Sequence, residues 1–509
     1  MLIKVVFLIV FFTIMILVGI YARKHTTNVG DFVLGGRAVG PWLTAFAYGT
    51  TYFSAVVFVG YAGQFGWRYG ISATWIGIGN AFIGSLLAWV ILGRRTRVMS
   101  HHLKSTTMPD FFGSRYDSRA LRIIASAIAF IFLIPYTASV YNGLSRLFGM
   151  AFDVPYWICV LAMAVLTGIY VVLGGYMATA INDFIQGIIM LGGIFFVVVA
   201  VLSKNGGFVE AIQRLAQLES EVPATAGMPG AYVSFFGPDP VNLLGVVVLT
   251  SLGTWGLPQM VHKFYTIKNE KSIKSGTIIS TVFAVVISGG CYFLGGFGRL
   301  YDNEGIYKAD GSVVFDAIVP YMLSSLPDVL VGIVVVLVLS ASMSTLASLV
   351  MTSSSTLTLD FIKGNLVKNM SEKKQIMTMR ILIVGFIALS IIIALNPPTF
   401  IAQLMGISWG ALAGSFLAPF LYGLYWKRVT RAAVWASFAT GVGITMSNLF
   451  LKYIASPINA GAIAMVAGLI IVPVVSILTP KMDQGKVEEI FSCYGETVTE
   501  NSKKSIEAA

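Results

Sequence analysis

The chain has 509 residues, of which 56% are hydrophobic and only 11% are charged. Soluble globular proteins carry roughly 25% charged residues, so this composition excludes a soluble protein and indicates an integral membrane protein in a lipid bilayer. The net charge of +11 does not point to nucleic acid, because lysines and arginines gather in short segments between apolar runs. We find no polar segment long enough for a soluble domain, and so we expect neither an enzyme nor an obligatory protein partner.

Apolar runs of about 20 residues recur along the chain and predict an all-α integral membrane protein with about thirteen transmembrane helices. We expect a single transmembrane domain over residues 1–480 and a polar cytoplasmic tail over 481–509. Cations favour alternate gaps between the runs, which predicts an N-terminus outside and a C-terminus inside the cell membrane. The expected spans are roughly 3–22, 41–64, 70–93, 120–148, 154–175, 180–203, 240–264, 273–298, 327–358, 379–396, 400–426, 430–452 and 460–479.

A segment rich in serine and threonine, Ser340–Asp360, directly continues an apolar run. Within it, Ala341, Ser344, Thr345 and Ser348 share one helix face, because they follow i, i+3, i+4, i+7 spacing. Uncharged oxygen ligands inside a membrane suit a hard, singly charged cation such as sodium. Small residues also let transmembrane helices pack closely, so this segment alone leaves both interpretations open.

Two predicted spans contain helix-breaking clusters. The second holds Gly49–Ala55, and the seventh holds Thr250–Gln259, with two glycines and a proline within six positions. Because the seventh span comes five after the second, the two could open two five-helix repeats, over about 40–203 and 240–426. Interrupted helices at matching positions of two repeats are typical of the binding site of a transporter.

Asp183 is a carboxylate at the start of the sixth predicted span. An intramembrane carboxylate is costly and indicates a functional site. An aspartate near a helix start is also a common N-cap, so both interpretations stand.

These features together resemble the sodium:solute symporter family, which includes bacterial proline and pantothenate symporters and sodium–glucose transporters. The resemblance extends from about residue 5 to 480 and implies a LeuT-type 5+5 inverted-repeat fold, with an extra N-terminal helix and two C-terminal helices. Its motifs are residues 32–37 (FVLGGR), 49–55 (GTTYFSA), 173–178 (LGGYMA) followed by Asp183 and Gln186, 256–258 (GLP) and 343–346 (MSTL).

The resemblance also implies the sites. For sodium (Na+, the coupling ion), it implies the hydroxyls of Ser344 and Thr345 with carbonyls of Ala341, Thr50 and Phe53. Asp183, with Ser342 and Ser348, resembles a second sodium position or the exit path.

The expected solute site lies at the two breaks and on the helices that face them. The structural alternative for its large aromatic residues is simple core packing. The expected lining residues are Tyr52, Ser54, Ala55, Tyr136, Tyr141, Thr254, Trp255 and Gln259. Tyr52 departs from the proline symporters, which carry an aspartate at this position close to the sodium site.

We therefore expect a secondary active transporter that couples inward sodium flow to uptake of a small carboxylate-bearing solute. Candidate solutes are pantothenate, proline or another amino acid, and monocarboxylates. Two alternatives remain: a proton-coupled carrier of the same fold, which would rely on Asp183, and a sodium-coupled sugar or polyol symporter.

Overall fold

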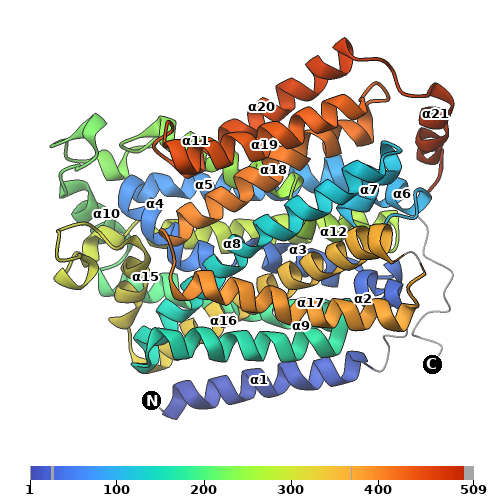
Figure 1. The fold of residues 1–509 in the computed structure, drawn as a ribbon. Coiled ribbons are helices and arrows are strands. Elements are labelled where there is room, and N and C mark those ends of the chain that lie inside the picture. Colours follow the sequence, from blue (N-terminus) through green and yellow to red (C-terminus); the bar gives the residue numbers. More distant parts are fainter. Residues whose placement is uncertain (1, 24–27, 368, 498–509) are drawn as a thin grey trace.

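The computed structural model describes residues 2–23, 28–367 and 369–497, which form a bundle of helices lying side by side (Figure 1). Helix α1 (Leu2–Arg23) lies on one side of the bundle, and α20 (Pro457–Leu478) lies on the opposite side. One end carries α10 (Phe208–Gln217) and α15 (Phe315–Ser324), and we call it the loop end. The opposite end, the tail end, carries α6 (Arg94–His102), α7 (Met108–Arg115) and α21 (Gln484–Ser492).

Ten helical segments of the described residues are long and apolar enough to cross a membrane, and a bent pair of helices raises the number to as many as eleven. This confirms a multi-span, all-α membrane protein, while the count of thirteen stays a prediction. The ten segments are Leu2–Tyr21, Val56–His102, Arg119–Phe152, Gly175–Lys204, Glu270–Gly295, Asp328–Lys363, Glu372–Leu395, Ile401–Tyr425, Arg431–Leu451 and Pro457–Leu478.

Helix α9 (Tyr156–Lys204) joins the fifth and sixth predicted spans without a loop. Its two arms meet at Gly175, whose φ of 60° and ψ of −163° are not helical. A side chain at this position would be strained, and the missing Cβ also lets the backbone approach Phe32. The second arm starts there, so Asp183 lies two turns inside it rather than at its N-cap.

Both predicted helix breaks are present. Helix α3 (Pro41–Tyr52) ends at the first, and the chain continues through a π-helical segment, Val56–Tyr61, into α4 (Ala62–Tyr69). Helix α11 (Pro240–Leu252) ends at the second. After a short 3₁₀ turn the chain continues as α12 (Pro258–Tyr265), and the two parts are bent by 41°.

The hydroxyl-rich segment lies in α16 (Asp328–Thr356), which continues into a π-helical segment, Leu357–Leu366. Every residue from Leu337 to Thr356 is buried. The helix packs against α3, α9 and α8 (Arg119–Phe152), so its serines and threonines face protein rather than lipid.

The remaining helices complete the bundle around these elements. Helices α18 (Ile401–Tyr425), α19 (Arg431–Leu451) and α20 pack together on one side. Helix α17 (Glu372–Leu395) contacts α8, α9 and α16. The others are α2 (Val29–Leu34), α5 (Thr74–Gly79), the π-helical segment Asn80–Leu87, α13 (Glu270–Ala284) and α14 (Gly290–Gly295).

Part of the expected tail is ordered against the bundle. Helix α21 is held by ion pairs of Glu488 with Lys427 and of Lys486 with Asp117, at 2.5 and 2.9 Å. Tyr494 donates a hydrogen bond to the carbonyl of Leu424 at 2.7 Å. Residues 498–509 of the expected tail lie outside the described residues.

At the loop end, Asp316 of α15 supports the start of α18. Its Oδ2 accepts a hydrogen bond from the Ile401 N–H at 3.3 Å, and its Oδ1 is buried with no hydrogen-bond partner among the described residues. Burial raises the pKa of Asp316 from 3.8 to about 6, against the opposing effects of that hydrogen bond and of Arg146. The ionised carboxylate therefore costs folding free energy.

The Asp316→Asn variant tests this cost. Because the folded-state pKa is raised, the favourable contribution of the protonated group is complete below pH 4 and is lost as the pH rises through 6. At pH 7.5 we expect the free energy of unfolding of the variant to exceed that of the wild type by up to about 3 kcal/mol. The variant should therefore melt at a higher temperature. Melting temperatures of the purified protein in detergent should converge near pH 4. A difference that does not depend on pH would contradict this account.

Candidate sodium site and solute site

The first site begins where α3 ends inside the bundle. The last four carbonyls of a helix have no partner within it, and the helix dipole makes that end electronegative. In α3, the carbonyls of Thr50 and Thr51 belong to this last turn, and both residues are fully buried. They face a neighbouring helix, which supplies the partners.

Those partners are two hydroxyls of α16. Ser344 Oγ lies 3.0 Å from the Thr50 carbonyl oxygen and 3.1 Å from that of Ala341. Thr345 Oγ1 lies 3.2 Å from the carbonyl oxygens of Thr50 and Thr51 and 3.1 Å from that of Ala341. Three carbonyls and two hydroxyls from two helices thus converge in the interior.

The chemistry of this set fits sodium. All five groups are uncharged oxygens, and each hydroxyl has lone pairs that can turn toward a cation when its hydrogen turns away. A hard monovalent cation is held by such oxygens in place of its hydration water. The cation would replace the direct contacts between α3 and α16 and hold the same two helices together.

Two residues expected at the ion positions are placed differently. The hydroxyl of Ser342 donates to the Val338 carbonyl of its own helix at 2.6 Å, so it is not directed at Asp183. Phe53 lies one residue beyond α3, and its N–H donates to the Gly49 carbonyl. The described contacts of the two hydroxyls with the end of α3 are to Thr50 and Thr51, so a carbonyl ligand from Phe53 stays a prediction.

Asp183 and Ser348 both contact the same lysine side chain. The Lys263 ammonium of α12 lies 3.8 Å from Asp183 Oδ2 and donates a hydrogen bond to Ser348 Oγ at 2.9 Å. Ser348 Oγ is in turn 2.8 Å from Thr51 Oγ1. Lys263 therefore lies between two of the residues that were predicted for the second ion position.

A cluster of buried aromatic side chains surrounds the first break. The Tyr52 hydroxyl donates to the Thr250 carbonyl at 2.5 Å and so joins the two broken helices. The Tyr52 ring stacks on Phe53 at 4.3 Å and on Trp409 of α18 at 6.2 Å, and Trp409 meets the Tyr136 ring edge-on at 5.9 Å. We call Tyr52, Tyr61, Tyr136, Tyr292 and Trp409 the aromatic cluster.

Three donors of the aromatic cluster lie in the interior, where the Tyr292 hydroxyl is beside Asn80 and the Trp409 indole is beside Tyr136. Tyr52 has the hydroxyls of Tyr61, Tyr136 and Tyr292 as electrostatic neighbours. Among the described residues, the hydroxyls of Tyr61 and Tyr292 and the indole N–H of Trp409 have no hydrogen-bond partner of normal geometry. Buried polar groups are normally satisfied, so these three donors are candidates for hydrogen bonds to a solute.

Three other residues predicted to line the solute site make contacts outside the aromatic cluster. Thr254 Oγ1 and Trp255 Nε1 donate to the carbonyls of Gly84 and Ile83 at 3.0 Å, and these two bonds fix the second break. Gln259 lines a small cavity with Lys263 and Ser348, apart from the aromatic cluster.

Three further residues that were predicted to line the solute site pack within the protein instead. Ser54 Oγ accepts from the Val56 N–H at 3.2 Å and starts the next helical segment. Ala55 packs on Gly143 of α8. The Tyr141 hydroxyl is buried, and it lies beside the Thr167 side chain of α9 rather than at the break.

Sequence reasoning missed Thr51, Tyr61, Lys263, Tyr292 and Trp409. Tyrosine and tryptophan within apolar spans look like packing residues, so the three aromatic residues gave no distinct signal. Lys263 lies at the end of the predicted span 240–264, where a lysine side chain is normally expected to reach the interface. The signal for Thr51 was its position next to Thr50 in the last turn of α3.

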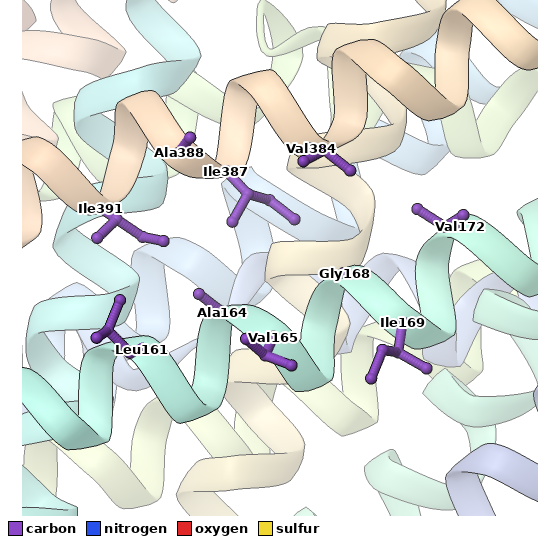
Figure 2. Close-up of a pocket in the computed structure, with 10 residues that line it drawn as sticks. All are labelled: Leu161, Ala164, Val165, Gly168, Ile169, Val172, Val384, Ile387, Ala388 and Ile391. Atoms are coloured by element: carbon purple, nitrogen blue, oxygen red, sulfur yellow. The ribbon is translucent and has the colours of Figure 1, made fainter.

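An apolar groove on the helical bundle is not a solute site. It measures about 520 Å³ and lies between α9 and α17, where Figure 2 shows side chains of both helices facing each other. All ten lining residues are apolar, and Leu161, Val165 and Ile169 are 41–60% exposed. This composition matches contact with lipid chains rather than with a polar solute.

The sodium site can be tested through Ser344→Ala/Thr345→Ala, with Ser342→Ala as the matched control on the same helix. A hydrogen-bonding ligand to a charged group contributes about 1.5–3 kcal/mol, so each lost hydroxyl should weaken sodium binding about 10- to 100-fold. The control, whose hydroxyl stays on its own helix, should bind as the wild type does. Binding of ²²Na⁺ to purified protein measures this, and equal affinities of the wild type and double variant would refute the assignment.

Gly84 permits the close approach of Tyr52 and provides a second test. A Cβ at this position would overlap the Tyr52 hydroxyl, whereas a Cβ at Gly192 of α9 meets no heavy atom within 4 Å. Gly84→Ala should cost about 1–3 kcal/mol of stability and weaken solute binding, because Tyr52 must move. Gly192→Ala should leave both unchanged. Thermal melting and the KM for uptake report the two effects, and an unaltered KM for Gly84→Ala would separate Tyr52 from the solute.

Comparison with solved structures places the fold. A Na+-coupled sialic acid symporter in a substrate-bound outward-open state superimposes with a TM-score of 0.75 at 19% identity, over 95% of this chain and 99% of that one. Mhp1, a nucleobase-cation-symport-1 family transporter in a closed conformation, gives 0.54 at 12% identity, over 92% and 99%. The predicted LeuT-type fold is thereby confirmed.

Comparison with sequences gives the family. An osmoregulated proline transporter of Bacillus subtilis (strain 168) is 26% identical over 471 residues, or 91% of this chain and 93% of the relative. A sodium/proline symporter of Staphylococcus aureus (strain JH9) is 29% identical over 451 residues, or 85% and 83%. The profile of the sodium:solute symporter family matches residues 32–441. The chain therefore belongs to the sodium:solute symporter family, and it is a sodium-coupled, multi-pass membrane transporter rather than an enzyme.

Proposed function

We propose that the chain uses the sodium gradient to take up a small solute that bears a carboxylate group. The observation that supports this most directly is the set of three unpartnered donors in the aromatic cluster: the Tyr61 and Tyr292 hydroxyls and the Trp409 indole N–H. An ionised carboxylate only accepts hydrogen bonds, and the tryptophan N–H only donates. The remainder of a small solute would lie against the rings of Tyr52, Phe53 and Trp409, which supply an apolar wall.

The relatives and Tyr52 favour different solutes within this class. Relatives at 26–29% identity are named as proline transporters, which supports proline or another small amino acid. Tyr52 stands where the proline symporters carry an aspartate, and its hydroxyl donates to Thr250 instead of offering a negative charge. A monocarboxylate or pantothenate needs no anionic partner for an amine, so these solutes belong in the same test.

The charges at the tail end support the proposed orientation in the cell membrane, with the tail end in the cytoplasm and the N-terminus outside. Arg94 pairs with Glu270, Lys427 with Glu488, and Arg431 with Asp117, all near α6, α7 or α21. Cations concentrate in cytoplasmic loops, so this end is the one we place inside.

Uptake of radiolabelled proline, pantothenate and short monocarboxylates into proteoliposomes tests the class of solute. We expect one of them to accumulate when a sodium gradient is imposed and not when only a pH gradient is imposed. Accumulation that follows the pH gradient without sodium would support the proton-coupled alternative instead. If a sugar accumulates and none of the acids does, the proposal that the solute bears a carboxylate is wrong.

Tyr61→Phe and Tyr292→Phe test the donors themselves. Each removes one hydroxyl while keeping the ring, and loss of a hydrogen bond to a charged group should raise the KM of the solute about tenfold or more. Tyr453→Phe, which removes an exposed hydroxyl bonded to Ser447, is the matched control and should leave KM unchanged. If both buried variants transport like the control, the aromatic cluster does not bind the solute.

A further inference from the structure

Asp183 and Lys263 form an isolated pair of charges within the helical bundle. Their side chains are 0% and 2% exposed, and Lys263 Nζ lies 3.8 Å from Asp183 Oδ2. Neither carboxylate oxygen has a hydrogen-bond partner among the described residues. The ammonium is therefore the positive charge that compensates Asp183.

The surroundings of the ammonium are those of a bound monovalent cation. The Asp183 carboxylate lies on one side, and Ser348 Oγ lies 2.9 Å from Nζ. The Tyr176 ring is 5.2 Å from Nζ, within the range of a cation–π contact. The carboxylate and the aromatic face come from α9 and the hydroxyl comes from α16, and Lys263 supplies the charge that they surround.

This group of side chains is linked to the sodium site. Ser348 accepts from Lys263, which leaves its own hydrogen free to donate to Thr51 Oγ1 at 2.8 Å. The carbonyl of the same Thr51 lies 3.2 Å from Thr345 Oγ1. A short chain of contacts thus runs from Asp183 through Lys263, Ser348 and Thr51 to the sodium ligands.

We propose that the Lys263 ammonium is a built-in cation, which occupies the position that a second sodium ion would take between Asp183 and Ser348. The protein consequently binds one sodium ion per chain, and Lys263 is a positioning residue that ties α12 to α16 and α9. The proposal rests on the sodium site described above and does not depend on which solute is carried.

Charge balance is the physical reason why a second sodium ion should not bind beside Lys263. Asp183 and Lys263 are neutral as a pair, so a sodium ion added beside them would leave an uncompensated positive charge in the interior, which is costly. Removal of the ammonium reverses the situation, because Asp183 is then a buried anion without a partner. The adjoining cavity, lined by Gln259, Ser348 and Ser355 among others, has a volume of only about 10 Å³, room for one water. Truncation of Lys263 would enlarge this cavity.

Equilibrium binding of ²²Na⁺ to the purified full-length protein in detergent tests the proposal by counting sodium ions per chain. We expect one ion for the wild type and for Lys263→Arg, which keeps the charge. Lys263→Ala should bind two, because Asp183 then takes a sodium ion. Lys263→Ala/Asp183→Asn should return to one. The count requires no transported solute, so a wrong solute in the uptake assay leaves this result unaffected.

Two outcomes would overturn the proposal. A wild-type count of two that falls to one in Asp183→Asn would make Asp183 a sodium ligand despite Lys263. A folded Lys263→Ala that still binds one ion would show that Asp183 does not attract a cation in its absence. If Lys263→Ala does not fold, the wild type and Asp183→Asn still test the proposal. A built-in cation predicts one bound sodium ion per chain in both proteins.

Discussion

The structure depends on a helix that stops inside the bundle. Helix α3 ends at Tyr52, and its last carbonyls need partners that lipid does not offer. Ser344 and Thr345 supply them, and this requirement explains why a hydroxyl-rich face of α16 is turned inward and packed against α3. The apolar rest of the chain surrounds this contact and shields it from lipid.

The same break is also a structural element that the proposed sodium site and the proposed solute site share. The carbonyls of Thr50 and Thr51 face Thr345 in the proposed sodium site, while Tyr52, the next residue, belongs to the aromatic cluster and bonds to Thr250 of the second broken helix. A sodium ion that holds α3 against α16 therefore also positions Tyr52. Such an ion shifts the conformational equilibrium only by its different affinities for the two states, and the effect is reciprocal: the solute changes sodium affinity by the same factor.

Much of the fold and the core of the proposed sodium site could be predicted from the sequence. Helical spacing placed Ala341, Ser344 and Thr345 on one face, and the helix-poor cluster at Gly49–Ala55 located the break that faces them. The aromatic residues of the proposed solute site were less predictable, because Tyr61, Tyr292 and Trp409 come from three distant helical segments. Only tertiary packing shows which of many buried rings meet at the break and which hydroxyls stay without partners.

Lys263 shows that the pattern of charges along the sequence does not always predict which cations reach the membrane interface. Counting cations between apolar runs assumes that each reaches the interface, as long side chains near helix ends usually do. Here α12 starts only after the break at Leu257, and its last turn lies beside the second arm of α9 rather than in solvent. A buried lysine is tolerated only with a partner, and so is a buried aspartate. Asp183 and Lys263 therefore account for each other: the carboxylate that resembled an ion ligand in the sequence is matched by a cation that the protein itself provides.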